Sequence, residues 1–113
     1  MQVVFIVLNK VECLDTILKE FAENGIKGAT ILDSRGMAHS LEEFTELHFI
    51  ASLRMILDPD RQESKTIFTV IEDDQIKNVS EIVNKATGCL DKTDTGIIFT
   101  VPVSYTEGLG EKK

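Results

Sequence analysis

Apolar residues open the chain in an unbroken run, residues 3–8 (VVFIVL). A continuous, β-branched run of this kind predicts a strand that is buried on both faces. Asn9 follows as a candidate helix N-cap, and Glu12 stands three residues later, the spacing of a capping box. Apolar residues then recur at helical spacing and stop at Asn24 and Gly25, which tolerate the left-handed conformation that ends helices. The buried stripe of this helix is expected to consist of Val11, Leu14, Ile17, Leu18 and Phe21.

The same pattern returns in the second half of the chain. Residues 66–71 predict another strand, and Asp73 or Asp74 is the expected cap of a second amphipathic helix. This helix is expected to end at Thr87 and Gly88. Its predicted buried residues are Ile76, Val79, Ile82, Val83 and Ala86.

Each helix is followed by a further predicted strand, at residues 28–33 and 97–103, and a polar tail closes the chain at residues 104–113. Two strand–helix–strand halves predict an α+β, ferredoxin-like βαββαβ fold, in which an antiparallel sheet carries two helices on one face. A chain of 113 residues has room for one domain, so residues 1–113 are expected to form a single unit. Because the strands are apolar on both sides, we expect sheets of several copies to pack together in a symmetric oligomer.

An insertion, residues 36–64, separates the two halves. A helix over roughly residues 46–57 is predicted within it, and a strand is the competing interpretation. The insertion holds more large apolar residues than one narrow helical stripe needs. It is interpreted either as a helix that covers the domain's own core or as a docking surface for a partner protein. The residues expected to contact such a partner are Phe44, Phe49, Ile50 and Met55.

Composition limits the possible partners and the cellular setting. The net charge of −7 argues against nucleic acid, whose binding depends on Lys and Arg that neutralise phosphates. No apolar run approaches the roughly 20 residues needed to cross a bilayer, and the N-terminus lacks the charged region and cleavage site of a signal peptide. Cys13 and Cys89 form neither a CxxC pair nor a zinc spacing, so we expect free thiols in the reducing cytoplasm.

Candidate catalytic and metal-binding residues are sparse. The chain contains no G-x-S-x-G elbow, P-loop or HExxH motif, so we expect no enzymatic activity. His39 and His48 lie nine residues apart, without the spacing of a recognised zinc or iron motif. No metal site is therefore predicted.

Three segments carry a resemblance to a known family. They are residues 25–30 (GIKGAT), residues 66–74 (TIFTVIEDD), and Thr87 and Gly88 followed by residues 96–103 (GIIFTVPV). In this order and spacing, the chain resembles the nitrogen-regulatory P-II signalling superfamily over most of its length outside the insertion. The resemblance implies a homotrimer whose subunit clefts bind adenine nucleotides. It also implies that the long loop after the second strand carries a signal to enzymes or membrane transporters.

The resemblance implies a set of ligand-binding residues by position. Those that match the surroundings of the adenine and ribose are Leu8, Gly28, Thr30, Gly36 and Val70, with Met37 included beside them. Those that match the loop near the phosphates are Thr87, Gly88 and Gly96. Lys92 or, as the alternative, Lys112 is the candidate phosphate-contacting cation. A glycine-rich loop suits an anion, because bare backbone N–H groups approach it closely.

Two departures from the family alter the expected ligand. The family's phosphate-contacting lysine is Ile97 here, and its paired arginines have no counterpart in residues 104–107. Each lost charge-assisted contact removes about 1.5–3 kcal/mol of binding free energy. AMP, ADP or another small metabolite is therefore expected as the effector in preference to ATP. Residues 37–64 contain no tyrosine, so uridylylation of this loop is not expected.

Two further functions are compatible with the same architecture. One is a ligand-independent interaction module that uses the apolar insertion as its anchor. The other is a metal-responsive trimer like the CutA proteins. The function that the pattern and the resemblance together favour is a P-II-like regulator of a transporter or a metabolic enzyme.

Overall fold

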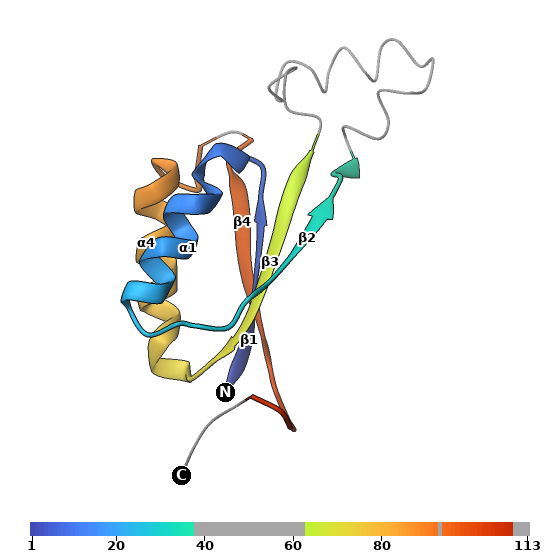
Figure 1. Ribbon diagram of the computed structural model, residues 1–113. Coiled ribbons are helices and arrows are strands. Elements are labelled where there is room, and N and C mark those ends of the chain that lie inside the picture. The colour runs from blue at the N-terminus through green and yellow to red at the C-terminus, as the bar shows by residue number, and fades with distance from the viewer. Residues whose placement is uncertain (38–62, 93, 110–113) are drawn as a thin grey trace.

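The computed structural model describes residues 1–37, 63–92 and 94–109, which form a four-stranded antiparallel sheet with two helices on one face (Figure 1). The strand order is β2-β3-β1-β4, so β1 and β3 are central and β2 and β4 form the edges. The predicted α+β arrangement of sheet and helices is confirmed. In chain order the elements are β1 (Gln2–Leu8), the 3-10 turn η1 (Val11–Cys13), α1 (Leu14–Glu23), β2 (Thr30–Ser34), β3 (Ser64–Ile71), the 3-10 turn η2 (Asp73–Gln75), α4 (Ile76–Thr87) and β4 (Gly96–Pro102).

Strand β1 shows how the helices divide the two faces of the sheet. It pairs antiparallel with both β3 and β4, and its residues alternate in burial. Val4, Ile6 and Leu8 are fully buried beneath the helices, whereas the residues between them are only partly buried. The prediction of a strand buried on both faces is therefore wrong for the single chain, because one helical layer covers only one face.

Both helices begin differently from the prediction. A 3-10 turn precedes each of them, with Lys10 as the N-cap of η1 and Glu72 as the N-cap of η2. Neither N-cap side chain makes a capping hydrogen bond. The predicted caps Asn9 and Asp73 or Asp74 are wrong, because the additional 3-10 turn moves each start by one residue or more.

The helix C-termini agree with the hydrophobic pattern, and the core agrees with it in part. The residues that were predicted to be buried but are only partly buried are Val11, Leu14, Leu18, Ile76 and Ala86. Gly25 has φ 84° and Gly88 has φ 90°, the left-handed conformation predicted for both positions. Side chains from both helices and from β1 and β3 meet in one buried cluster. Its members are Val4, Ile6, Leu8, Ile17, Phe21, Ile26, Ile67, Ile71, Val79, Ile82 and Val83.

Strand ends are set by pairing: β1 and β3 end at Leu8 and Ile71 as predicted, and the other strand ends differ from the prediction by one or two residues. β2 begins at Thr30, two residues later than predicted, since the Gly28 carbonyl accepts a hydrogen bond from the Thr69 hydroxyl instead of joining the strand ladder. β3 begins two residues early because Ser64 pairs with Ser34. Residues 38–62 lie outside the described part, and with them the predicted helix at 46–57 and its competing strand.

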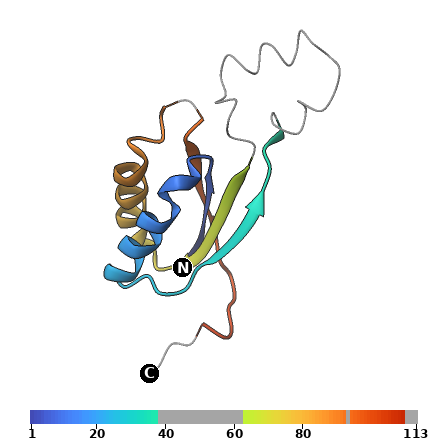
Figure 2. The ribbon, with the colours of Figure 1, turned by 45° about the horizontal axis from the view of Figure 1, so that its top comes forward.

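The second face of the sheet is apolar and carries no helix from residues 1–37, 63–92 or 94–109. Both views place α1 and α4 on the same side of the sheet (Figures 1 and 2). On the other side the Phe5 ring stacks on Phe99 with centroids 5.0 Å apart and lies 5.9 Å from Phe68. We call this surface the open face; its most exposed large side chains are Leu32, Ile97, Phe99 and Val101, between 44% and 57% exposed. Among the described residues, no helix is long and apolar enough to span a membrane.

Candidate functional site

The turn after α4 gathers several of the predicted ligand-binding residues. Gly88 is left-handed, and Cys89 also has a positive φ of 132°, which is strained for a residue with a side chain. Asn84 holds this turn in place, because its side-chain oxygen accepts a hydrogen bond of 2.8 Å from the Leu90 backbone N–H. The turn is therefore a preformed loop at the end of a helix.

Two lysine side chains reach this turn from different parts of the chain. Lys10, in the turn between β1 and η1, donates a hydrogen bond of 2.8 Å from Nζ to the Thr87 carbonyl. A Cβ added to Gly88 would lie 3.8 Å from Lys92 Nζ and 3.9 Å from Lys10 Nζ. The structure thus places predicted Lys92 beside predicted Gly88, and it adds Lys10, which the sequence reasoning missed. Lys10 is visible in the sequence as a cation directly after the first strand, but nothing local connects it with residue 88.

Gly96 has a structural reason to be glycine. It pairs with Leu8, has φ 148°, and a Cβ built there would lie 2.5 Å from the Val7 carbonyl oxygen. That separation is shorter than any ordinary contact, so β4 approaches β1 this closely only because position 96 lacks a side chain.

Two other predicted residues are buried in the single chain. Leu8 is fully buried in the core, and Thr87 is 1% exposed with its hydroxyl donating to the Val83 carbonyl. Within this chain, neither side chain reaches the surface, so only their backbone groups are available to a ligand.

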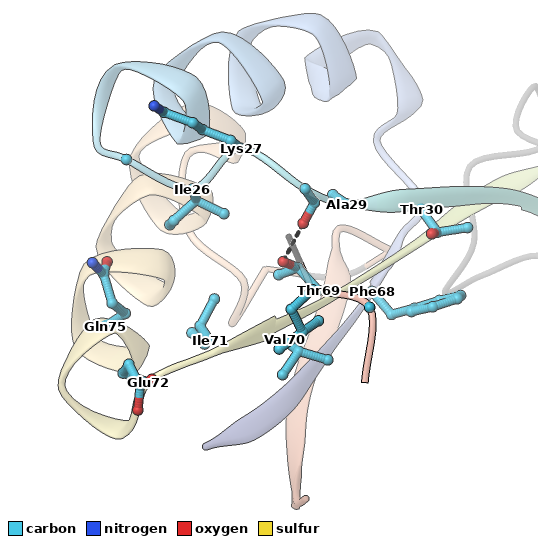
Figure 3. Close-up of a pocket in the computed structure, with 14 residues that line it drawn as sticks. Ile26, Lys27, Ala29, Thr30, Phe68, Thr69, Val70, Ile71, Glu72 and Gln75 are labelled. Carbon is cyan, nitrogen blue, oxygen red and sulfur yellow. Dashed lines mark hydrogen bonds between the residues drawn. The ribbon is translucent and has the colours of Figure 1, made fainter. Parts of the chain in front are cut away.

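A pocket of about 550 Å3 lies at the opposite end of the sheet (Figure 3). It opens where the segment leading into β2 separates from the end of β3. Gly28 and Thr69 both line it, and the Thr69 hydroxyl donates a hydrogen bond to the Gly28 carbonyl. The side-chain oxygen of Gln75 is buried at its edge and has no hydrogen-bond partner among the described residues. Three predicted ligand residues line this pocket: Gly28, Thr30 and Val70.

The predicted ligand residues therefore fall into two groups. Val70 pairs with Val3, and Gly96 pairs with Leu8, so the groups are separated by five residue steps along β1, or about 17 Å at about 3.4 Å per residue. Gly36 and Met37 follow the end of β2, and Met37 is 77% exposed. The predicted partner-contacting residues Phe44, Phe49, Ile50 and Met55 lie outside the described residues.

Polar groups cluster where β2 and β3 lead into the insertion. The Ser34 and Ser64 hydroxyls are 2.7 Å apart, and the Thr66 hydroxyl donates to Ser34 at 2.9 Å. On the opposite side of the pair, the hydrogen bond from Lys65 to Asp33 raises the pKa of Lys65. These contacts fasten the two ends of the insertion together.

Neither cysteines nor metal ligands form a site in the described part. Cys13 and Cys89 are free thiols. Among residues 1–37, 63–92 and 94–109, no group of three or more His, Cys, Asp or Glu side chains is placed to hold a metal ion. His39 and His48 lie outside these ranges.

Comparison with known protein families gives a match over the full length of the chain. The family model described as "Nitrogen regulatory protein P-II" matches residues 1–113, the whole chain. No curated protein matches the chain.

Proposed function

The chain belongs to the nitrogen regulatory P-II family, whose members are small regulatory signalling proteins, and we propose that it is a homotrimer that binds an adenine nucleotide between subunits. In this proposal the bound nucleotide changes how residues 36–64 contact a transporter or a metabolic enzyme in the cytoplasm. P-II proteins are regulators and not enzymes, so the output of the site is a change of binding.

The separation of the two groups of candidate residues is the observation that carries the proposal. One group (Gly28, Thr30 and Val70) lines the pocket, and the other (Thr87, Gly88, Lys92 and Gly96) lies at the turn after α4. The two groups lie about 17 Å apart, at opposite ends of the sheet within one subunit. A single small ligand that contacts both groups needs the pocket of one copy beside the Gly88 turn of another. A cleft between subunits brings them together, whereas the isolated chain does not.

The open face supports association of this kind. Its three aromatic rings contact one another across β3, β1 and β4, and partly exposed aliphatic side chains lie on the same face. Contiguous apolar patches on a small domain mark interaction surfaces. Full burial of such a side chain contributes about 1.5–3 kcal/mol, so covering the half that is still exposed contributes about 1 kcal/mol, and a symmetric trimer repeats that gain at each subunit.

The chemistry of the two groups fits the two ends of a nucleotide. The pocket offers the Thr30 hydroxyl, the backbone groups of Gly28 and Val70, and the Gln75 side-chain oxygen, which are groups that recognise the edge of a base. The turn offers cationic side chains and a bare glycine, which favour a phosphate. Ile97 stands where the family carries a lysine and is 57% exposed on the open face, so AMP or ADP is the preferred effector.

Native mass spectrometry and calorimetry test the proposal together. We expect a trimer at micromolar concentration, and heat on titration with AMP or ADP at millimolar concentration. Phe99→Ser should shift the trimer toward monomers, because Phe99 is half exposed and stacks on Phe5. Tyr105→Ser is the matched control, since it also removes an exposed aromatic ring but lies in the tail beyond β4.

Two results would overturn the proposal. A monomer at every concentration removes the inter-subunit site. A trimer that gives no heat with adenosine, AMP, ADP or ATP removes the nucleotide and leaves the ligand-independent interaction module.

A further inference from the structure

The tail that follows β4 forms part of the wall of the pocket. The chain turns back beyond β4 (Figure 1), and Gly108 and Leu109 line the pocket together with residues of β3 and of the segment before β2. Leu109 is 43% exposed, so more than half of this apolar side chain is covered. The end of the described chain therefore lies against elements that are far from it in the sequence.

Few hydrogen bonds hold this tail to the domain. The Val103 N–H donates to the Met1 carbonyl at 3.2 Å, and no later residue of the tail up to Leu109 makes a backbone hydrogen bond to another described residue. The bond from the Tyr105 hydroxyl to the Glu107 carboxylate stays within the tail. Beyond Val103, the tail is therefore held to the described part of the domain by packing alone.

A turn at Gly108 places Leu109 at the pocket. Gly108 has φ 82°, a left-handed conformation that residues with a side chain rarely adopt. A Cβ added there would meet nothing within 4 Å, so the backbone conformation, and not the surrounding space, favours glycine. An alanine at this position would disturb the turn without creating a clash.

Packing of one half-covered leucine holds the tail only weakly. Fixing the backbone of the six residues 104–109 costs conformational entropy, and this cost exceeds what the partial burial of one leucine returns. Segments with few buried contacts and few hydrogen bonds open at a small cost in free energy. We therefore expect the tail to exchange between a docked and a released position.

The docked tail leaves the pocket hollow. About 550 Å3 remains with Leu109 in the wall, which is within the usual range for small-molecule sites. Leu109 thus borders the pocket and does not fill it. A molecule bound there would lie against Leu109 and would add to the contacts that hold the tail. Such a coupling is reciprocal, so the docked tail strengthens binding by the same factor.

We propose that residues 103–109 form a strap that docks on the pocket through Leu109, and that docking of the strap and occupation of the pocket by a small ligand favour each other. The identity of the ligand rests on the proposed nucleotide function, whereas docking of the strap does not. The strap carries Tyr105, which is 73% exposed, so the state of the pocket changes the position of an exposed aromatic ring. This element is separate from residues 36–64 and gives the protein a second ligand-dependent surface.

Fluorine NMR of the 3-fluorotyrosine-labelled protein tests docking of the strap. Tyr105 is the sole tyrosine, so one resonance reports on the strap. A docked strap tumbles with the protein and gives a broader line than a peptide of residues 103–109, which is the reference for a released strap. Leu109→Ser should narrow the line toward that of the peptide. Leu109→Met is the matched control and should leave the line broad, because it keeps an apolar side chain of similar volume.

Calorimetry with adenosine tests the coupling. Half of the free energy of burying a leucine corresponds to about fivefold in affinity, so Leu109→Ser should weaken adenosine binding by about that factor. Gly108→Ala should weaken binding in the same direction while Leu109 is kept, since it disturbs only the turn. Leu109→Met should stay within about twofold of the parent. Saturating adenosine should also broaden the Tyr105 line of the parent protein.

The outcomes distinguish the strap from the proposed function. A parent line as narrow as that of the peptide and equal to that of Leu109→Ser overturns the strap, even if adenosine binds. Equal adenosine affinity in the parent and in Leu109→Ser overturns the coupling. If adenosine and the adenine nucleotides give no heat, the nucleotide function fails, and a line that is broad in the parent and narrow in Leu109→Ser still supports the strap.

Discussion

Replacement of Gly96 by alanine tests whether close packing of β4 on β1 decides the identity of residue 96. An alanine Cβ there would lie 2.5 Å from the Val7 carbonyl oxygen and 3.4 Å from the Leu8 Cα. Both are backbone atoms of β1, a central strand that pairs on both sides, so neither can move without disturbing the pairing of β1. The φ of 148° adds strain for any residue with a side chain.

The expected loss of stability follows from these two contributions. The unfavourable dihedral costs about 1–3 kcal/mol. Forcing a methyl group into a closed space costs about 1–3 kcal/mol more. A loss of about 2–6 kcal/mol is a large part of the 5–15 kcal/mol that holds a typical domain together. At about 4 °C per kcal/mol for a domain of this size, the Tm should fall by about 8 °C or more.

Thermal unfolding by circular dichroism measures this effect, with Gly28→Ala as the matched control. A Cβ at Gly28 meets nothing within 4 Å, so this variant should differ from the parent by no more than about 1 kcal/mol. All proteins should be compared at one protomer concentration, because association makes Tm concentration-dependent. If Gly96→Ala and Gly28→Ala unfold at the same temperature, packing does not require a glycine at position 96, and its presence there needs another explanation.

Three further predictions follow from individual contacts. Tyr105 is the sole tyrosine and the chain has no tryptophan, so an ultraviolet titration reports on this one side chain. Its midpoint should lie above the usual tyrosine pKa of about 10, because the hydrogen bond to Glu107 raises the pKa of Tyr105. Glu107→Ala should lower the midpoint, and an unchanged midpoint would disprove this cause. The hydrogen bond to Asp33 raises the pKa of Lys65, so the pair stabilises the fold below the usual lysine pKa of about 10.4, and this contribution is lost as the pH rises through the raised pKa. The Tm difference between the parent and Lys65→Met should therefore shrink in that pH range. A difference that grows there would contradict the assignment. Asn84→Ala should cost about 1–2 kcal/mol in urea unfolding because the Leu90 N–H loses its acceptor, and no loss would mean that the turn is held by other contacts.

Local patterns were sufficient to predict most of the fold. The alternation of apolar stripes and glycine-terminated helices identified α1 and α4, and both left-handed glycines, Gly25 and Gly88, were expected from the chain alone. Helix starts were less accessible, because the 3-10 turns at Val11–Cys13 and Asp73–Gln75 leave no distinct signal in composition. Strand ends depended on partners distant in sequence, as in the pairing of Ser34 with Ser64.

The candidate site divides in the same way. The family resemblance assigned Gly28, Thr30 and Val70 to a ligand, and the fold brings these three to one pocket. Position could not show that Thr87 and Leu8 turn their side chains into the core, or that Gly96 is glycine because of Val7. Burial and close approach are properties of packed elements, and neighbouring residues in the chain do not encode them.

The sequence by itself determined the order of the elements and the apolar character of both sheet faces, because periodicity and helix-ending residues are local properties. Only the tertiary structure decided which charges meet. Lys10 and Lys92 are far apart in the chain and approach each other at Gly88 because β1 and α4 end at the same edge of the domain. The approach of two charges depends on distances through space, which no local pattern records.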